Sequence, residues 1–169
     1  MTGSFELYLI RHAIAEERGV AWPDDSKRPL TERGISRMRK IAHGLEQLGI
    51  TFDVLMTSPF VRARQTAEVV ASVFDPRPPI VSIESLAPGG SAQSVLADLE
   101  KQGKRSRVGL VGHEPGIGEL AGRLSGLRRP LELKKGAVCR IDLETLTASG
   151  GGTLRWFATP RMLRALGRQ

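Results

Sequence analysis

The chain has 169 residues, of which 40% are hydrophobic and 25% charged, so we expect one folded domain over residues 1–169 rather than a disordered chain. The formal net charge of +7 favours acidic or phosphorylated partners. The basic residues are scattered and aromatic residues make up only 5%, which argues against nucleic-acid binding.

The single cysteine, Cys139, excludes an internal disulfide and is typical of a cytoplasmic protein. No apolar stretch approaches the roughly 18–20 residues that span a bilayer, and no signal peptide is recognisable. We therefore expect a cytoplasmic location and no membrane association.

Apolar runs alternate with helical patterns along the chain. Strands are predicted at 5–10, 52–57, 79–83, 107–111, 137–143 and 153–158. Helices are predicted from the capping Thr31 to Gly49, from Pro59 (capped by Ser58) to about Phe74, from Ser91 or Ser94 to Lys101, over 115–124 and over 161–166. This order predicts an α/β fold: a three-layer αβα sandwich whose central sheet is mostly parallel, with an antiparallel edge and with helices on both faces.

Three predicted strands end in residues suited to an anion. The first ends in "RHA", with Arg11 and His12; the second ends in "TSP" and is followed by Arg62; the third ends in "GHEPG", with His113. Ligands of parallel sheets bind outside the carboxyl ends of the strands, so we expect these four side chains to share one edge. The remaining histidine, His43, is predicted to lie on a solvated helix surface.

Two histidines with two arginines indicate phosphoryl chemistry. No carboxylate cluster accompanies them, and two guanidinium groups would oppose a divalent cation, so we expect no metal and no cofactor. Arginine binds phosphoryl oxygens in a bidentate way, and a neutral imidazole can attack phosphorus. The pattern therefore predicts metal-free phosphoryl transfer through a histidine.

These segments resemble a known family. Arg11-His12-Ala13 is similar to the "RHG" signature of the histidine phosphatase superfamily, also called phosphoglycerate mutase-like. The second and third signatures are matched by "DVLMTSPFVRARQTAE" (53–68) and "LVGHEP" (110–115). "RPLTERG" (28–34) and "LKKGAVCRIDL" (133–143) also match, so the resemblance covers almost the whole chain. Within this superfamily, the short length of the chain and its "RPLT" and "GHEP" motif variants resemble most the SixA-type phosphohistidine phosphatases.

The resemblance implies that His12 is the nucleophile and that Arg11, His12, Arg62 and His113 bind the phosphate. The predicted positions of these residues at strand ends agree with that assignment. Ala13 replaces the commoner glycine, and its small side chain still lets the backbone approach a phosphate.

A general acid is harder to assign. Glu84 comes just after the predicted strand at 79–83 and is the nearest candidate by its position along the chain. An equally good interpretation is that Glu84 is simply a solvated glutamate at the end of a strand. Glu114 is a second candidate. A phosphoramidate leaves through a nitrogen that is easily protonated, so such a substrate has less need of a dedicated acid.

We expect a phosphatase that acts on phosphohistidine of a protein, such as a histidine-containing phosphotransfer domain. The region 75–94 is short where larger relatives insert lids, and an open site suits a phosphate presented on a protein surface. Two alternatives remain at this point: a phosphomonoesterase on a small metabolite, and a non-catalytic phosphate-binding module. The intact His12 argues against the second, because binding alone needs only the arginines.

Overall fold

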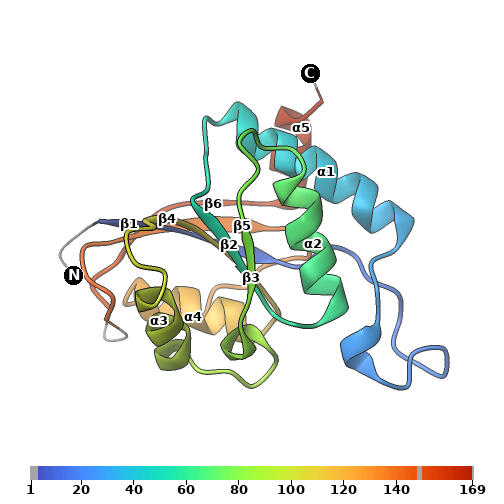
Figure 1. Ribbon diagram of the computed structural model, residues 1–169, viewed down its shortest axis with the longest axis horizontal. Helices are drawn as coiled ribbons and strands as arrows, with labels where there is room; N and C mark the ends of the chain where they lie inside the picture. The colour runs from blue at the N-terminus through green and yellow to red at the C-terminus, as the bar shows by residue number, and fades with distance from the viewer. Residues whose placement is uncertain (1–3, 148–149, 169) are drawn as a thin grey trace.

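Residues 4–147 and 150–168 are described by the computed structural model, and their strands form a six-stranded sheet (Figure 1). The strands are β1 (Phe5–Arg11), β2 (Val54–Thr57), β3 (Ile80–Ser82), β4 (Arg107–Gly112), β5 (Val138–Leu143) and β6 (Thr153–Ala158). The α-helices are α1 (Glu32–Gln47), α2 (Val61–Ala71), α3 (Ala92–Glu100), α4 (Gly116–Leu124) and α5 (Pro160–Leu166). Two short 3-10 turns, η1 (Asp25–Lys27) and η2 (Glu84–Leu86), lie in the connections after β1 and β3.

The strand order in the sheet is β3-β2-β4-β1-β5-β6. The strands β1 to β4 are parallel to one another, whereas β5 runs antiparallel to β1 and β6 antiparallel to β5. Helices α1, α2 and α5 cover one face of the sheet, and α3 and α4 cover the other (Figure 1). The predicted three-layer αβα sandwich, with a mostly parallel sheet and an antiparallel edge, is therefore confirmed.

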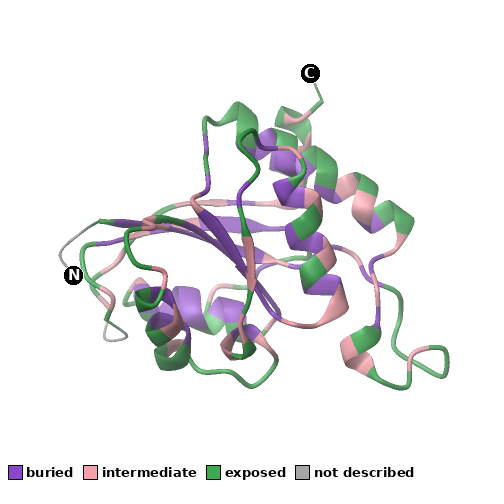
Figure 2. Cartoon of the chain, in the orientation of Figure 1, coloured by how far each residue is buried: buried purple, intermediate pink, exposed green. Residues whose placement is uncertain are grey.

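The central strand β1 is buried on both faces from Leu7 to Ile10, and Figure 2 shows the middle of the sheet mostly in purple. Leu7 and Leu9 pack into the core beneath α3 and α4, whereas Tyr8 and Ile10 pack into the core beneath α1, α2 and α5. A strand covered on both sides has no solvated face, and this is why its sequence is an unbroken apolar run rather than an alternation. The run stops where the strand leaves the sheet at Arg11.

The strands β2, β4 and β1 are neighbours in the sheet, so their carboxyl ends lie side by side. In register, Arg11 of β1 pairs with Gly112 of β4. The contact continues beyond β1, where the His12 N–H donates to Gly112 O at 3.0 Å. On the other side of β4, the Ser58 N–H donates to Val111 O at 3.0 Å. The prediction that three strand ends share one edge is confirmed.

The start of α2 differs from the prediction. The helix begins at Val61 with Phe60 as its N-cap, so the assignment of Ser58 as the cap and of Pro59 as the first helical residue was wrong. The Ser58 side chain is fully buried, and its Oγ contacts His113 in addition to accepting the Phe60 N–H. The Ser58 hydroxyl, which the local pattern assigned to the end of α2, therefore makes a tertiary contact with His113.

The start of α1 agrees with its predicted cap. Thr31 Oγ1 accepts the Gly34 N–H at 2.9 Å, and the helix then buries Met38, Ile41 and Leu45. Among residues 4–147 and 150–168 there is no helix with the length and apolar character needed to cross a membrane.

Candidate active site

His12 follows β1 directly and is buried, with 5% of its surface exposed. Its Nδ1 lies 2.7 Å from Ala13 O, and a carbonyl oxygen can only accept, so Nδ1 carries the proton and Nε2 keeps its lone pair. Burial lowers the pKa of His12 to about 3, and the charges of Arg62 and Arg11 act in the same direction. The imidazole is therefore neutral at physiological pH, with Nε2 available as a nucleophile.

Ala13 fixes the direction in which the chain leaves β1. Its N–H donates to Thr66 Oγ1 of α2 at 3.0 Å, and the Thr66 hydroxyl in turn donates to Arg62 O at 2.7 Å. No non-glycine residue of the described chain has a positive φ, so alanine at this position carries no backbone strain. The segment after His12 is thereby tied to the helix that carries Arg62.

Arg62 lies in the first turn of α2 and is only 2% exposed. Its Nε donates to His12 Nε2 at 3.3 Å. Its Nη1 donates to Asp25 O at 2.8 Å, and its Nη2 donates to the Asp25 carboxylate at 3.0 Å. Each nitrogen of the guanidinium thus has a partner, and its plane is fixed beside the His12 ring.

His113 lies beyond the end of β4, and its ring centroid is 5.1 Å from that of His12. Its Nε2 is 2.8 Å from Ser58 Oγ, which already accepts the Phe60 N–H at 3.2 Å. Ser58 and His113 therefore share a hydrogen bond in which either side can donate, because a hydroxyl has one proton and two lone pairs. Burial lowers the pKa of His113 to about 4, and the charge of Arg62 acts in the same direction, so this ring is also neutral.

Two buried side-chain nitrogens of the site have no partner within the described residues, namely Arg11 Nε and His113 Nδ1. The Arg11 side chain is otherwise held by its Nη1, which donates to Leu133 O at 2.8 Å. A buried donor left without an acceptor costs about 1–3 kcal/mol. Arg11 Nε is always a donor and therefore fits an anionic ligand, and His113 Nδ1 fits one in the tautomer that carries its proton there.

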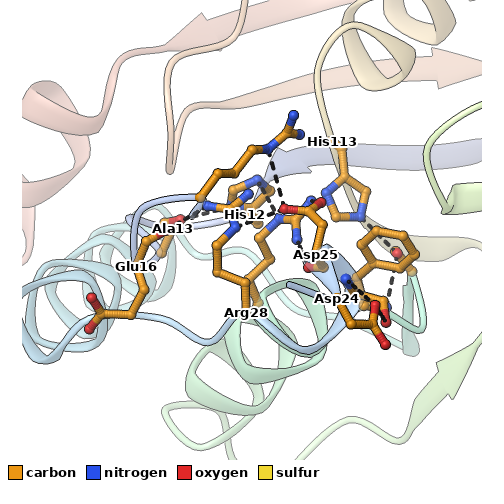
Figure 3. A network of polar contacts seen from close by, with 12 residues as sticks. His12, Ala13, Glu16, Asp24, Asp25, Arg28 and His113 are labelled. Atoms are coloured by element: carbon orange, nitrogen blue, oxygen red, sulfur yellow. Dashed lines mark hydrogen bonds and ion pairs between the residues drawn. The ribbon is translucent and has the colours of Figure 1, made fainter. Parts of the chain in front are cut away.

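Asp25 is the acidic centre of a cluster of arginines (Figure 3). Its Oδ1 accepts from Arg28 at 2.9 Å and lies 3.2 Å from Arg18, while its Oδ2 accepts from Arg62. Burial raises the pKa of Asp25, but the hydrogen bond from Arg28 and the charge of Arg62 outweigh it and lower the pKa below its usual range.

The structure brings together four of the five predicted site residues, which are Arg11, His12, Arg62 and His113. Glu84 lies at the start of η2, where its side chain is exposed and makes no hydrogen bond or ion pair within the described residues. Its role as a general acid stays a prediction.

Glu114, the second candidate acid, follows His113 and is half-buried. Burial raises the pKa of its carboxyl group, while hydrogen bonding to Leu133 N–H and the charge of Arg11 oppose that shift. A carboxyl group with a raised pKa is a better proton donor near neutral pH than a solvated one. Glu114 therefore has the more suitable surroundings of the two, and Glu84 the more open position.

Sequence reasoning missed the contributions of Arg28 and Ser58. Arg28 is 7% exposed and holds Asp25, while its Nη1 donates to Glu16 O at 2.6 Å. Both residues belong to segments that matched the family signatures, "RPLTERG" and "SPFVRARQTA", and that match was the available signal. Ser58 and His113 lie 55 positions apart, and Arg28 acts on the site through Asp25, which contacts Arg62 37 positions away, so neither spacing nor periodicity could assign these roles.

The groups that meet at the strand ends fit a tetrahedral oxyanion. Guanidinium and neutral imidazole N–H groups are donors, and such donors bind and stabilise phosphoryl oxygens. Over residues 4–147 and 150–168, no group of three or more His, Cys, Asp or Glu side chains is arranged to hold a metal ion.

Comparison with known proteins agrees with this chemistry. The family model of the histidine phosphatase superfamily (branch 1) matches residues 7–87. The chain is 30% identical over 145 residues to the phosphohistidine phosphatase SixA homolog of Haemophilus influenzae, covering 80% of this chain and 86% of that protein. It is 29% identical over 162 residues to the phosphohistidine phosphatase SixA of Escherichia coli K12, covering 94% of this chain and 96% of that protein.

A solved structure of the protein histidine phosphatase SixA complexed with tungstate has the same fold. It superposes with a TM-score of 0.81 at 28% identity, covering 94% of this chain and 99% of that one. Fold and relatives together define a phosphatase, a hydrolase of phosphorylated compounds. The chain belongs to the histidine phosphatase superfamily and is SixA-like within it, as its signatures predicted.

Proposed function

We propose that the protein is a metal-independent phosphatase that works through a phosphohistidine intermediate on His12. The supporting observation is the state of its imidazole: the proton lies on Nδ1 against Ala13 O, and the lone pair lies on Nε2. A nucleophile must be unprotonated, and the low pKa of His12, about 3, keeps it so throughout the physiological range.

The phosphoryl group would sit between the donors that converge on His12. Arg11 Nε and His113 Nδ1, the two unpartnered nitrogens, would each donate to a phosphoryl oxygen, with the His113 proton on Nδ1. Arg62 supplies a fixed positive charge beside Nε2. Donors placed in advance stabilise the charge that spreads over the equatorial oxygens in the transition state, and they do so without reorganising.

The reaction proceeds in two displacements. In the first, His12 Nε2 forms a bond to phosphorus as the bond from phosphorus to the leaving atom breaks, and the leaving atom takes up a proton. In the second, a water oxygen forms a bond to phosphorus as the bond from phosphorus to Nε2 breaks, and Nε2 regains its lone pair. The attacking water gives up one proton to the solvent, and inorganic phosphate leaves. When the substrate is itself a phosphohistidine, the first step exchanges one phosphorus–nitrogen bond for another, so the two sides differ little in bond energy.

Phosphohistidine on a protein, such as a histidine-containing phosphotransfer domain, is the substrate that we propose. Two relatives that match 94% and 80% of the chain are phosphohistidine phosphatases by name, and tungstate, the ligand of the solved SixA structure, is a tetrahedral oxyanion like phosphate. The short connection from β3 to α3 leaves little chain to form a lid. We also propose a cytoplasmic location, in keeping with the single buried cysteine, Cys139.

The test of the mechanism is the substitution His12→Asn, with His43→Asn as the matched control. His43 is an exposed histidine on α1 that contacts only Glu46, at 3.1 Å. We expect His12→Asn to lower turnover by at least about 10³-fold and to abolish an acid-labile, alkali-stable phosphoenzyme trapped by rapid quench. The control should keep both. Full turnover by His12→Asn would rule out the mechanism.

The substrate is tested separately by comparing kcat/KM on a phosphohistidine protein, free phosphohistidine, and a panel of sugar and lipid phosphates. We expect the phosphohistidine protein to be preferred and EDTA to leave its turnover unchanged. Preference for a sugar phosphate by orders of magnitude would favour a phosphomonoesterase on a small metabolite. Binding of phosphate without turnover of any substrate would indicate a non-catalytic module.

A further inference from the structure

A groove of about 600 Å³ runs between α1, α5 and the segment 134–136, beside the candidate active site. Six of its lining residues are cations and none is acidic. The cations are Arg11, Arg37, Lys134, Lys135, Arg161 and Arg164. We call this feature the α1–α5 groove. Its volume lies within the range of about 300–1,000 Å³ that ligand sites occupy, and its lining gives it a strongly positive potential.

The cations of the α1–α5 groove form no ion pair within the described residues, although the charges of Glu17 and Glu114 oppose the lowering of the pKa that burial causes in Lys135 and Arg11 respectively. Apart from Arg11, the side chains of these cations make no hydrogen bond or ion pair with any residue in the described part of the chain. Burial lowers the pKa of Arg164, and the charges of Arg37 and Arg161 act in the same direction. Like charges held together without a counter-charge repel one another, and a bound anion would relieve that repulsion.

The floor of the groove is apolar, since it includes Met38, Ile41 and Pro160. A cationic rim over an apolar floor suits a polypeptide segment that carries both carboxylates and apolar side chains. A bare inorganic anion would use only the rim. A nucleic-acid strand would gain from aromatic stacking, and no aromatic residue lines the groove.

The groove opens from the candidate active site itself. Arg11 and Ala13, the residues on either side of His12, are both part of its lining. The Gly136 N–H donates to Arg11 O at 3.1 Å, which joins the basic segment 134–136 to the end of β1. A carrier whose phosphoryl group lies on His12 would therefore pass over the groove.

The cavity on the other side of the site has the opposite character. It measures about 140 Å³, adjoins His113, and its lining includes Glu114 and Glu119 but no arginine or lysine. An acidic flank of a substrate is repelled there and attracted by the α1–α5 groove. The two sides together would orient an asymmetrically charged substrate.

We propose that the α1–α5 groove binds an acidic polypeptide segment of the phosphorylated protein, next to the phosphorylated residue, and so selects the substrate. This inference rests on the proposed function, because it assumes that the carrier of the phosphoryl group is a protein. Charge complementarity and the continuity of the groove with Arg11 identify the occupant.

The test compares two synthetic phosphohistidine peptides of equal length, one with Asp and Glu flanks and one with Lys flanks, alongside free phosphohistidine. We expect wild-type kcat/KM to be about tenfold or more higher for the acidic peptide, since charge steering accelerates association by about 10–10³-fold. The triple variant Arg37→Ala/Arg161→Ala/Arg164→Ala should lose this preference. It should keep turnover of free phosphohistidine within about twofold, which also shows that the variant is folded.

The matched control removes the same charge elsewhere, as Arg123→Ala/Arg128→Ala/Arg129→Ala. These arginines are exposed on and after α4 and make no ion pair within the described residues. The control should keep the preference for the acidic peptide. The wild-type preference should also weaken as the salt concentration rises to about 0.5 M, because exposed charges are screened.

The outcomes separate the two proposals. If phosphohistidine is hydrolysed neither in the two peptides nor as the free amino acid, the proposed function fails. If it is hydrolysed but both peptides react equally, or if the control triple loses the preference as fully as the groove triple, the inference fails alone. The inference is also overturned if the groove triple abolishes binding of a short oligonucleotide or of phosphatidylserine vesicles while leaving the peptide preference intact.

Discussion

Arg62 in the candidate active site and Arg161 in the α1–α5 groove carry the same charge in opposite surroundings. Arg62 is 2% exposed, and each of its nitrogens has a partner in His12 or Asp25. Arg161 is exposed and makes no ion pair within the described chain. The first is held in one orientation, as stabilisation of a transition state requires. The second is a mobile charge that attracts anions without fixing their geometry.

The comparison teaches that a count of arginines does not locate a site. Burial and hydrogen-bond partners decide whether an arginine holds its guanidinium in a fixed orientation or contributes only a positive electrostatic potential. The predictions below therefore set a change in the active site against one in the α1–α5 groove or on an exposed surface.

The largest effect is expected from Arg62→Lys, with Arg64→Lys as the control. Lysine keeps the positive charge but lacks the planar guanidinium, so it cannot donate hydrogen bonds to His12 and to Asp25 at the same time. We expect kcat to fall about 10²–10³-fold, the usual loss when one fixed donor to the transition state is removed. Arg64 lies two residues further along α2, is exposed and only approaches Glu68 at 4.0 Å, so its variant should react normally.

A fall of less than about tenfold in Arg62→Lys would mean that charge alone suffices in the active site. The contrast with the α1–α5 groove would then disappear, because in both regions arginine would act only through its positive charge.

The second prediction concerns stability at acidic pH. Burial lowers the pKa of His12 to about 3 and of His113 to about 4, from an ordinary value of 6.5. Below pH 6.5 the unfolded chain binds protons that the folded chain does not, so the free energy of unfolding falls as the pH falls toward 4. We expect a slope of roughly 1 kcal/mol per pH unit for each histidine, measured by denaturant unfolding between about pH 6.5 and pH 4.5.

Replacing either buried histidine by asparagine should flatten that slope by about half. The groove triple variant should leave it unchanged, because arginine does not titrate in this range. An equal slope in wild type and in both histidine variants would show that other groups control the acid stability.

The smallest effect is expected from Asp25→Asn, with Asp24→Asn as the control. Asparagine has nearly the same size but lacks the negative charge that orients Arg62 and Arg28. We expect kcat to fall about tenfold with a smaller change in KM, because Asp25 acts through Arg62 rather than on the substrate. Asp24 contacts only its exposed neighbours Ser26 and Lys27, so its variant should match wild type.

A double-mutant cycle between Asp25→Asn and Arg62→Lys tests that positioning role. Additive losses would contradict it, since residues that act through one contact lose their separate effects when both are changed.

Local patterns in the sequence predicted the arrangement of the strand ends. The apolar run of 7–10 predicted a strand buried on both faces, and the abrupt end of that run placed Arg11 and His12 at the end of the strand. His113 was placed in the same way by the run of β4 and the glycine that ends it. The convergence followed because parallel strands end at one edge of the sheet, a rule that needs no knowledge of side-chain contacts.

The errors arose where a side chain had a choice of partners. Ser58 was predicted as the cap of α2 from its position before Pro59, yet the helix begins at Val61 and the Ser58 hydroxyl bonds His113 as well as the Phe60 N–H. A cap and a tertiary partner are both reasonable roles for a serine, and only the approach of β4 to β2 brings His113 within reach. The role of Arg28 was missed for a related reason, because its partner Asp25 acts on α2, far away in the chain.

The sequence by itself determined the layers of the fold, the positions of its strands along the chain and the family, because these depend on hydrophobic periodicity and on contiguous motifs. Only the tertiary structure decided the tautomer of His12, the contact of His113 with Ser58 and the hold of Asp25 on Arg62. It alone also gathered the cations of α1, α5 and 134–136 around one groove. Those features depend on distances between atoms that are remote along the chain, and such distances exist only once the chain has packed.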